Sequence, residues 1–388
     1  MPAPSAANAA PPIEAPRARS LAARVSGAVL LLFMAGGLAS TLLAVQQEKL
    51  DLAPHPLNRT NFLDGASMRD MAAALANAPL ARIAADSERQ FSWIATGDLG
   101  PQVRQGCDGW LFLAEELMPQ PDADRHLRER ARAVAAIQEQ LRARGIRLVV
   151  AVVPDKSRVE SARLCTLGRS AAIDNRIRVW TAQMAAAGVP LIDTTAALQG
   201  LLTRGEDPFL RTDTHWTENG ADAAAHAVAD AVRGLGMELE PHQDYDIQRD
   251  APARRPGDLV RLAGLDGLPQ ALQPAAEDAV SSRFTPRPAA AAAPAASAEA
   301  DLFGDAALPQ VALIGTSFSR TSHFAEFLAA ALQTPVGNFA RDGGNFWGSA
   351  GAYFASDAFK QTPPKLIVWE LPERVLQLPV GQERWSLP

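Results

Sequence analysis

The sequence predicts an α/β protein in which helices cover both faces of a parallel sheet, preceded by one transmembrane helix. Four short apolar runs predict the strands, and charged segments with helical periodicity lie between them. This alternation is typical of a parallel sheet, because parallel strands need a crossover connection. An uncharged stretch at residues 25–45 predicts the transmembrane helix.

The N-terminal segment predicts the compartment. Residues 1–24 are rich in Ala and Pro, and we expect a disordered cytoplasmic tail. As a helix, residues 25–45 span roughly 30 Å, the thickness of one bilayer core. The arginines Arg17, Arg19 and Arg24 precede this helix, so the positive-inside rule places the rest of the chain outside the cytoplasm. A cleaved signal peptide is the alternative, although its apolar region usually has about 7–15 residues.

Composition narrows the function. The 388 residues are 47% hydrophobic, enough for one large core or two modest ones. The net charge of −6 argues against nucleic acid as a partner, because phosphate binding needs a basic surface. The two cysteines, Cys107 and Cys165, either stay free or pair outside the cytoplasm. No Cys/His spacing suggests zinc, and no metal or organic cofactor is expected.

The main domain is expected at residues 106–388, after a linker with short helices at 46–105. The predicted strands occupy residues 148–153, 190–193, 311–315 and 366–370. The predicted helices occupy residues 123–144, 170–187, 217–234 and 322–332. Residues 271–300 are Ala-, Pro- and Ser-rich, which predicts a solvated insert without a core. Ligands of such sheets bind beyond the carboxyl ends of the strands, so polar residues there are the candidates.

Ser317 is the candidate nucleophile. In "ALIGTSFS" a strand turns into a helix, and Gly315 permits the tight turn. The serine then projects from the strand end, where backbone N–H groups can receive an oxyanion. The alternative is that Thr316, Ser317 or Ser319 only caps the helix.

Asp213 and His215 are the candidate orienting carboxylate and base. A catalytic serine needs a base, and the base needs a carboxylate on its other nitrogen. The spacing in "TDTHWTENG" allows both side chains to lie on the same side of a turn. Alternatively, Asp213 or Thr217 caps the following helix. A metal site that adds His226 or His323 is a rival, although neither lies well placed.

The loop "RDGGNFW" is the candidate oxyanion and substrate site. Asn345 and a backbone N–H of Gly343 or Gly344 could join the N–H of Ser317 around an oxyanion, with Arg341 beside them. A plain turn is the alternative. After the last strand, Glu370 and Arg374 either line the site or form a structural ion pair, and we prefer the ion pair.

Five motifs in this order resemble one known family. The motifs are "GCDGWLFL", "VVPDKSRV", "TDTHWTENG", "IGTSFS" and "VWELPERVL". Over residues 106–376 they resemble the AlgJ/AlgX-like alginate O-acetyltransferases of the SGNH-hydrolase superfamily, with Asp-x-His before the serine. The resemblance implies a three-layer α/β/α sandwich. It also implies that Ser317 is the nucleophile, His215 the base and Asp213 its orienting partner. Because the chain ends soon after the last motif, we expect the membrane-anchored AlgJ type.

The resemblance implies a bacterial inner-membrane protein with its catalytic domain in the periplasm. The expected reaction transfers acetyl groups to an alginate-like exopolysaccharide through acetyl-Ser317, with Trp216 walling the site or stacking on a sugar. The implied partners are a membrane-bound acyltransferase as acetyl donor and other polysaccharide biosynthesis subunits. An acetylesterase with the same triad and a non-catalytic subunit of an export complex are the alternatives.

Overall fold

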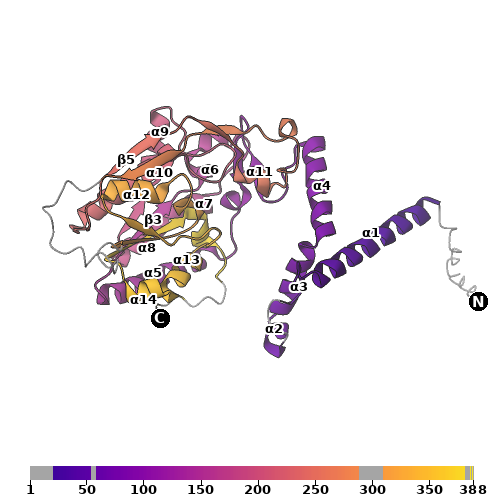
Figure 1. Ribbon diagram of the computed structural model, residues 1–388, viewed down its shortest axis with the longest axis horizontal. Coiled ribbons are helices and arrows are strands. Elements are labelled where there is room, and N and C mark those ends of the chain that lie inside the picture. Colours follow the sequence, from indigo (N-terminus) through magenta and orange to yellow (C-terminus); the bar gives the residue numbers. More distant parts are fainter. Residues whose placement is uncertain (1–20, 54–57, 288–308, 381–384, 386, 388) are drawn as a thin grey trace, which may run out of the picture. The chain divides into compact units, whose positions relative to one another are not determined.

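The computed structural model describes residues 21–53, 58–287, 309–380, 385 and 387. The chain divides into two compact units, residues 1–91 and 92–388. Figure 1 shows the ribbon and the labels used below.

The first unit is helical. Its helices are α1 (Leu21–Gln46), α2 (Arg59–Leu63), α3 (Ala66–Ala76) and most of α4 (Pro79–Thr96). Helix α1 has 26 residues and is long and apolar enough to cross a membrane, and it contains the predicted span 25–45. It begins at Leu21, so the end of the predicted disordered tail is helical; residues 1–20 of that tail lie outside the described residues.

The second unit contains a five-stranded parallel sheet in the order β10-β9-β11-β3-β4. Its strands are β3 (Arg147–Val153), β4 (Leu191–Asp193), β9 (Val311–Ile314), β10 (Val336–Asn338) and β11 (Leu366–Pro372). The four predicted strands are confirmed. Strand β10 was missed, because Val-Gly-Asn contains no apolar run that would reveal it.

Helices cover both faces of the sheet, as Figure 1 shows for α10 and α12 on one side of β3 and α5 and α13 on the other. Along β3, Val150 and Val152 belong to one hydrophobic core, whereas Val149 and Ala151 belong to the other. The first core is completed by α5 (Ala123–Ala143), α8 (Arg176–Ala186), α13 (Gly348–Ala355) and α14 (Asp357–Gln361). The second is completed by α9 (Thr195–Thr203), α10 (Glu218–Gly234) and α12 (Phe324–Leu332). The three-layer α/β/α sandwich is therefore confirmed.

Short elements surround the sheet. They are β1 (Val103–Gln105), β2 (Leu111–Leu113), α6 (Lys156–Val159), α7 (Ala171–Asp174), β5 (Tyr245–Arg249), β6 (Ala253–Arg255), α11 (Asp258–Leu262), β7 (Glu277–Ala279) and β8 (Ser282–Pro286). Strand β1 pairs with β2, so the folded unit begins before the expected boundary at residue 106. Cys107 and Cys165 form a disulfide, which decides the question that the sequence left open.

The predicted insert at residues 271–300 is wrong in its first half. Strand β7 pairs with β6, and β8 pairs with β5, so residues 271–287 contribute two paired strands. Their short polar pairs carry no long apolar run, which explains why composition suggested a solvated segment. Residues 288–300 lie outside the described residues.

Candidate active site

Ser317 lies just beyond the carboxyl end of β9, in the short 3-10 helix η6 that runs from Ser317 to Ser319. The turn is tight, since a Cβ on Gly315 would lie 2.5 Å from a carboxylate oxygen of Glu370. Thr316 caps η6, because its hydroxyl accepts the N–H two residues ahead (3.4 Å). The capping role therefore belongs to Thr316, and the half-buried Ser317 is left for another contact.

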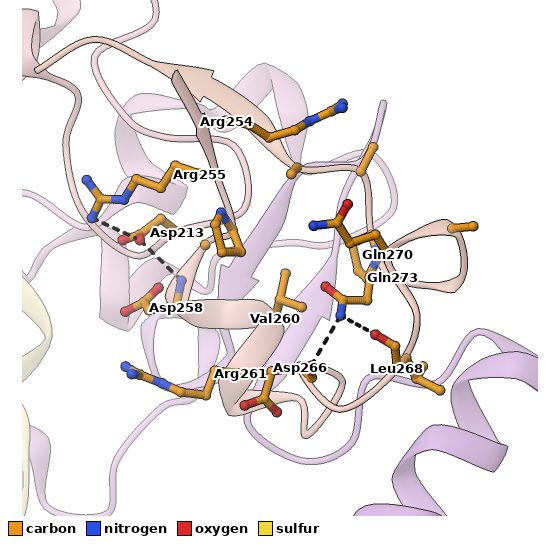
Figure 2. Close-up of a pocket in the computed structure, with 16 residues that line it drawn as sticks. Asp213, Arg254, Arg255, Asp258, Val260, Arg261, Asp266, Leu268, Gln270 and Gln273 are labelled. Atoms are coloured by element: carbon orange, nitrogen blue, oxygen red, sulfur yellow. Dashed lines mark hydrogen bonds and ion pairs between the residues drawn. The ribbon is translucent and has the colours of Figure 1, made fainter. Parts of the chain in front are cut away.

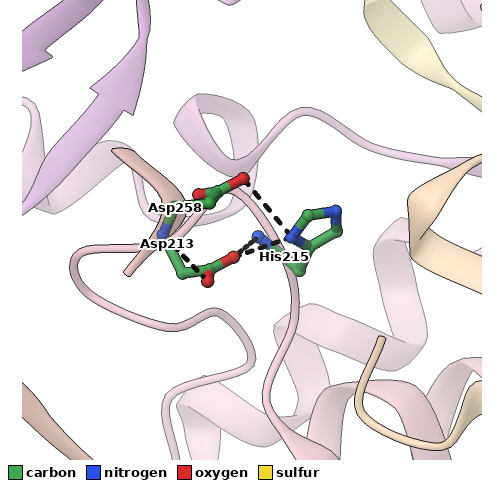
Figure 3. A group of neighbouring side chains, drawn as sticks. All are labelled: Asp213, His215 and Asp258. Atoms are coloured by element: carbon green, nitrogen blue, oxygen red, sulfur yellow. Dashed lines mark hydrogen bonds and ion pairs between the residues drawn. The ribbon is translucent and has the colours of Figure 1, made fainter. Parts of the chain in front are cut away.

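His215 lies between Ser317 and Asp213. Its Nε2 is 2.7 Å from Ser317 Oγ, and its Nδ1 is 2.7 Å from Asp213 Oδ1 (Figure 3 shows the aspartate side). The His215 backbone N–H also donates to Asp213 Oδ1 (2.9 Å). Burial favours the neutral acid, but the hydrogen bonds and charge of His215 outweigh it and hold the pKa of Asp213 well below its usual range. The three predicted side chains thus meet in the arrangement of a serine–histidine–aspartate triad.

The segment that follows His215 is fixed by packing. Thr217 is the N-cap of α10, since its hydroxyl accepts the Gly220 N–H (3.1 Å). Trp216 is fully buried; its indole packs on Phe318 (ring centroids 5.1 Å apart) and donates to the Thr321 carbonyl (3.2 Å). The expectation that Trp216 stacks on a sugar is therefore wrong, because no face of the ring is open. Trp216 instead packs against Phe318, the residue that follows Ser317, and so supports the triad from within the core.

The buried Lys156 anchors residues 211–215, which carry Asp213 and His215 and are here called the triad loop. Its Nζ donates to the carbonyls of Leu111 (2.6 Å), Arg211 (2.9 Å) and Asp213 (3.0 Å). The side chain is only 1% exposed, and this burial lowers the pKa of Lys156 to about 8. Three donors on three carbonyls fully occupy an ammonium group, so the charged form suits this position.

Glu277 of β7 holds the same loop from the side. Its carboxylate accepts the backbone N–H of Arg211 (2.6 Å) and both the N–H and the hydroxyl of Thr212 (2.8 Å each). A carboxylate that accepts several backbone N–H groups fixes their orientation strongly. The segment predicted to be a solvated insert therefore takes part in shaping the site.

Asp258, the first residue of α11, is a second carboxylate beside the triad (Figure 3). Its Oδ1 accepts the Thr214 N–H (2.7 Å), and its Oδ2 lies 3.7 Å from His215 Nδ1. Its own N–H donates to Asp213 Oδ2 (3.1 Å). Burial, together with the charge of Asp213, raises the pKa of Asp258. Sequence reasoning missed this residue, which lies 45 positions from Asp213, just as it assigned no role to Lys156.

Asp213, His215 and Asp258 also have the spacing of metal ligands, with their ligand atoms within 4.8 Å of one another. The ligand atoms of His215 and Asp213 are already engaged. Nδ1 is bonded to Asp213, and the second oxygen of Asp213 faces the Arg255 guanidinium (3.5 Å) as well as a backbone N–H. A cation here would have to displace these contacts and approach Arg255. We therefore interpret the cluster as a hydrogen-bonded group around His215 and not as a metal site.

The glycine-rich loop after β10 lies beside the nucleophile turn, because the Arg341 N–H donates to the Gly315 carbonyl (3.1 Å). The Gly344 N–H donates to the Arg341 carbonyl (3.1 Å) and closes a turn. Gly344 is therefore not free to serve as the oxyanion donor that the sequence suggested. Asn345 is exposed with a φ of 46°, and Arg341 is exposed, so their substrate roles stay predictions.

Glu370 and Arg374 do not form the preferred ion pair. Glu370 is fully buried and accepts the Thr316 N–H (2.6 Å) and the Ser319 hydroxyl (3.0 Å), while burial raises its pKa. Arg374 lies 3.6 Å from Glu115 instead. Glu370 therefore fixes the turn that presents the nucleophile.

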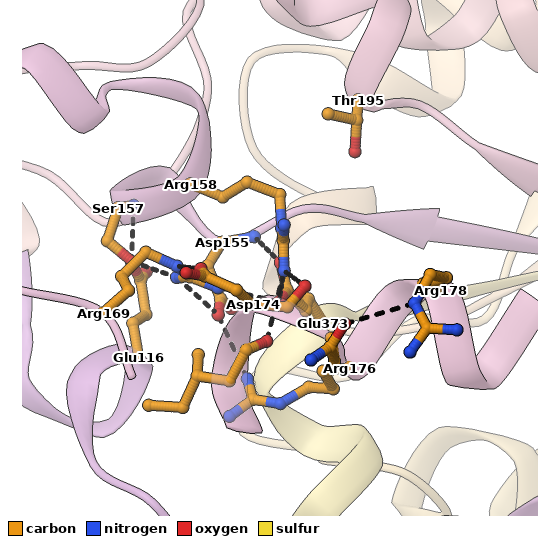
Figure 4. Close-up of polar contacts among 12 residues, drawn as sticks. Glu116, Asp155, Ser157, Arg158, Arg169, Asp174, Arg176, Arg178, Thr195 and Glu373 are labelled. Carbon is orange, nitrogen blue, oxygen red and sulfur yellow. Dashed lines mark hydrogen bonds and ion pairs between the residues drawn. The ribbon is translucent and has the colours of Figure 1, made fainter. Parts of the chain in front are cut away.

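Figure 4 shows a network of ion pairs at the carboxyl ends of β3 and β11. Glu373 accepts from Arg158 (2.6 Å) and Arg169 (2.9 Å), whereas Asp155 accepts from Arg169 (3.2 Å) and Arg176 (3.1 Å). Burial, with the charge of Glu373, raises the pKa of Asp155 to about 7. Because the Asp155 N–H also donates to Glu373 (3.0 Å), the network ties the two central strands together.

Gly257→Ala is expected to lower the free energy of unfolding by about 1–3 kcal/mol and to reduce activity. A Cβ at this position would overlap the Thr212 carbonyl, so α11 must move away from the triad loop. Thermal unfolding measures the loss of stability, and ester turnover measures the loss of activity. Gly234→Ala is the matched control, because a Cβ on Gly234 meets nothing within 4 Å. Equal behaviour of the two variants would show that α11 does not brace the loop.

A serine, a histidine and an aspartate joined at the carboxyl edge of a three-layer sandwich define a protein of the serine-dependent acyl-transfer class. The family model for the SGNH hydrolase-like domain of the acetyltransferase AlgX matches residues 103–373. The chain belongs to this family, and it is an O-acetyltransferase.

Individual relatives agree with the family assignment. Two relatives are each named probable alginate O-acetylase AlgJ. That of Pseudomonas putida is 36% identical over 281 residues, 72% of this chain and 71% of the relative. That of Pseudomonas aeruginosa is 32% identical over 72% of this chain and 71% of its own length. The O-acetyltransferase domain of Pseudomonas putida AlgJ has a TM-score of 0.62 at 32% identity, covering 73% of this chain and 94% of that domain. Pseudomonas aeruginosa AlgX has a TM-score of 0.52 at 26% identity, covering 70% and 62%.

Proposed function

We propose that the protein transfers acetyl groups to hydroxyl groups of alginate, or of a closely similar exopolysaccharide, through an acetyl-Ser317 intermediate. The observation that carries the proposal is the continuous contact from Ser317 Oγ to His215 Nε2, and from His215 Nδ1 to Asp213, at 2.7 Å each. The names of the AlgJ relatives support alginate as the acceptor.

The proposed reaction has two half-reactions. His215 Nε2 takes the proton of Ser317, whose oxygen attacks the acetyl carbonyl of the donor. The group that carried the acetyl leaves the donor carbonyl and takes the proton from His215, and acetyl-Ser317 remains. A polysaccharide hydroxyl then gives its proton to Nε2 and attacks the acetyl group, and the Ser317 oxygen leaves and regains the proton. We assign the Ser317 N–H and the Asn345 amide to the oxyanion.

A cavity of about 1060 Å³ reaches the triad at Asp213, whereas Ser317 and His215 do not line it, so we assign it to sugar units that neighbour the acetylated one (Figure 2). Its wall includes Asp213 and the three arginines Arg254, Arg255 and Arg261. Guanidinium groups pair well with carboxylates, which an acidic polysaccharide such as alginate carries on its sugar rings. The cavity matches or exceeds the size of most ligand pockets, roughly 300–1,000 Å³, so it has room for part of a polymer.

We place the protein in the bacterial inner membrane, with α1 as a single-pass anchor and the second unit in the periplasm. The length and apolar character of α1 support the anchor, and the disulfide between Cys107 and Cys165 supports an oxidising compartment. Because acetyl-CoA is cytoplasmic, we assign the donor role to a membrane-bound acyltransferase. The other proposed partners are subunits of polysaccharide biosynthesis.

The test uses the full chain purified in detergent, given a chromogenic acetyl ester with and without alginate oligosaccharides. We expect acetylated oligosaccharides by mass spectrometry, and faster ester turnover when the acceptor is present. Release of acetate without acetylated sugar would identify an acetylesterase and contradict the proposal. Absence of any turnover or acetyl-enzyme would favour the non-catalytic subunit.

A further inference from the structure

The backbone around the triad is bonded to α11 at three successive points. Thr214 donates its N–H to Asp258 Oδ1 (2.7 Å), the Asp258 N–H donates to Asp213 Oδ2 (3.1 Å), and the Leu259 N–H donates to the Thr212 carbonyl (3.3 Å). One residue of α11, Asp258, therefore touches both the residue before His215 and the carboxylate that orients it.

The second oxygen of Asp258, Oδ2, faces the imidazole of His215. It lies 3.7 Å from His215 Nδ1, too far for a hydrogen bond but within the range of a direct charge interaction with a protonated imidazole. The side chain is 20% exposed, so solvent screens this interaction only in part. The imidazole edge that becomes positive during catalysis thus faces two carboxylates, Asp213 and Asp258.

We infer that Asp258 is a positioning residue of the proposed triad, which fixes the Asp213–His215 loop and stabilises the protonated imidazole formed in each half-reaction. The inference rests on the proposed function, since it concerns the same triad. Among the hydrogen bonds and ion pairs of the described residues, Asp258 has none to Ser317. It acts through His215.

Other charged groups also surround His215, so their effects must be separated from that of Asp258. They are Arg255, whose guanidinium lies 3.5 Å from Asp213, and Lys156, which donates to the Asp213 carbonyl. Glu277 accepts the backbone N–H groups of Arg211 and Thr212, the two residues before Asp213. Arg255 and Lys156 are cationic, whereas Asp213 and Asp258 are acidic.

Two substitutions separate shape from charge. Asp258→Asn keeps an oxygen that can accept the Thr214 N–H, but it places a neutral amide where the second oxygen faces His215 Nδ1. Asp258→Ala removes both contacts. Asp230→Asn is the matched control, because Asp230 is exposed on α10 and pairs only with Arg233 (3.3 Å) among the contacts described for it.

The experiment measures kcat, KM and their pH dependence for acetyl ester turnover by the full chain in detergent. We expect Asp258→Asn to lower kcat about 10-fold with little change in KM, and to move the acid limb of kcat/KM about one pH unit lower. The limb moves in this direction because an imidazole that has lost a neighbouring negative charge protonates only at lower pH. Asp258→Ala should lose more activity, and Asp230→Asn should match the parent protein.

A second readout keeps the result interpretable if a variant is less stable. The rate at which a fluorophosphonate labels Ser317, measured against pH on folded protein, reports the same activation of the serine. An unshifted pH profile, even with lower activity or stability, would overturn the inference and leave Asp258 a structural residue only. Labelling that persists in Ser317→Ala would instead overturn the proposed function. A Ser317→Ala variant that is inert, combined with a normal Asp258→Asn, would overturn this inference alone.

Discussion

Replacing Ser317 with alanine is expected to lower kcat for acetyl transfer by about 10⁵-fold or more, the loss seen when a triad nucleophile is removed. The reason is local: the hydroxyl contacts His215 Nε2 at 2.7 Å, and no acetyl-enzyme can form without it. Turnover of the acetyl ester and intact-protein mass spectrometry after a pulse of donor measure the two losses.

The fold should survive this change. The turn around Ser317 is held by Glu370 through Thr316 and Ser319, not by the Ser317 hydroxyl. We therefore expect the free energy of unfolding to change by no more than about 0.5 kcal/mol. Combining Ser317→Ala with His215→Ala should add little, because the two side chains act as one unit. A single variant that keeps more than a few per cent of activity would contradict the assigned nucleophile.

Much of the fold could be predicted, because its central strands are chemically distinctive. The run Leu148 to Val153 is buried on both faces, and a short, continuous apolar run of this kind is typical of a strand at the centre of a parallel sheet. The triad was predictable for a related reason. Asp213 and His215 lie two positions apart, and Ser317 follows a buried strand through Gly315, so each signal is local in the sequence.

The rest of the site was not predictable, because it depends on contacts between distant segments. Asp258 reaches the triad only because α11 packs on residues 211–215, and Glu277 does so only because β7 pairs with β6. The same reason explains the error at Trp216. An indole next to a catalytic histidine suggests a sugar platform, but burial between Phe318 and Phe324 is a property of the folded chain. A single sequence carries no signal for such contacts between distant segments.

The second large effect is expected at Asp213, whose two oxygens serve two sets of donors. Oδ1 accepts from the backbone N–H and Nδ1 of His215, and Oδ2 accepts from the Asp258 N–H and faces Arg255. An asparagine can supply only one such oxygen. If its NH₂ group faces His215, the imidazole must take the wrong tautomer, and if it faces Asp258, two donors meet.

The charge of Asp213 also makes stability depend on pH. Its pKa is held below the ordinary value of 3.8, so the ionised form stabilises the fold above that pH. This contribution is lost as pH falls through the lower pKa of the folded state. Asp213→Asn lacks the group, so its free energy of unfolding should fall less than that of the parent protein between neutral and strongly acid pH. Urea unfolding at several pH values measures the difference.

Asp213→Asn is therefore expected to lower kcat by about 10⁴-fold while the protein stays folded. The base is present, but the imidazole carries its proton on the wrong nitrogen. The loss should be smaller than that of Ser317→Ala and larger than that of Asp258→Asn, since Asp213 bonds Nδ1 at 2.7 Å whereas Asp258 lies 3.7 Å away. Ester turnover of the three variants in parallel tests this order. If Asp258→Asn lost more activity than Asp213→Asn, Asp258 and not Asp213 would be the carboxylate that orients the imidazole.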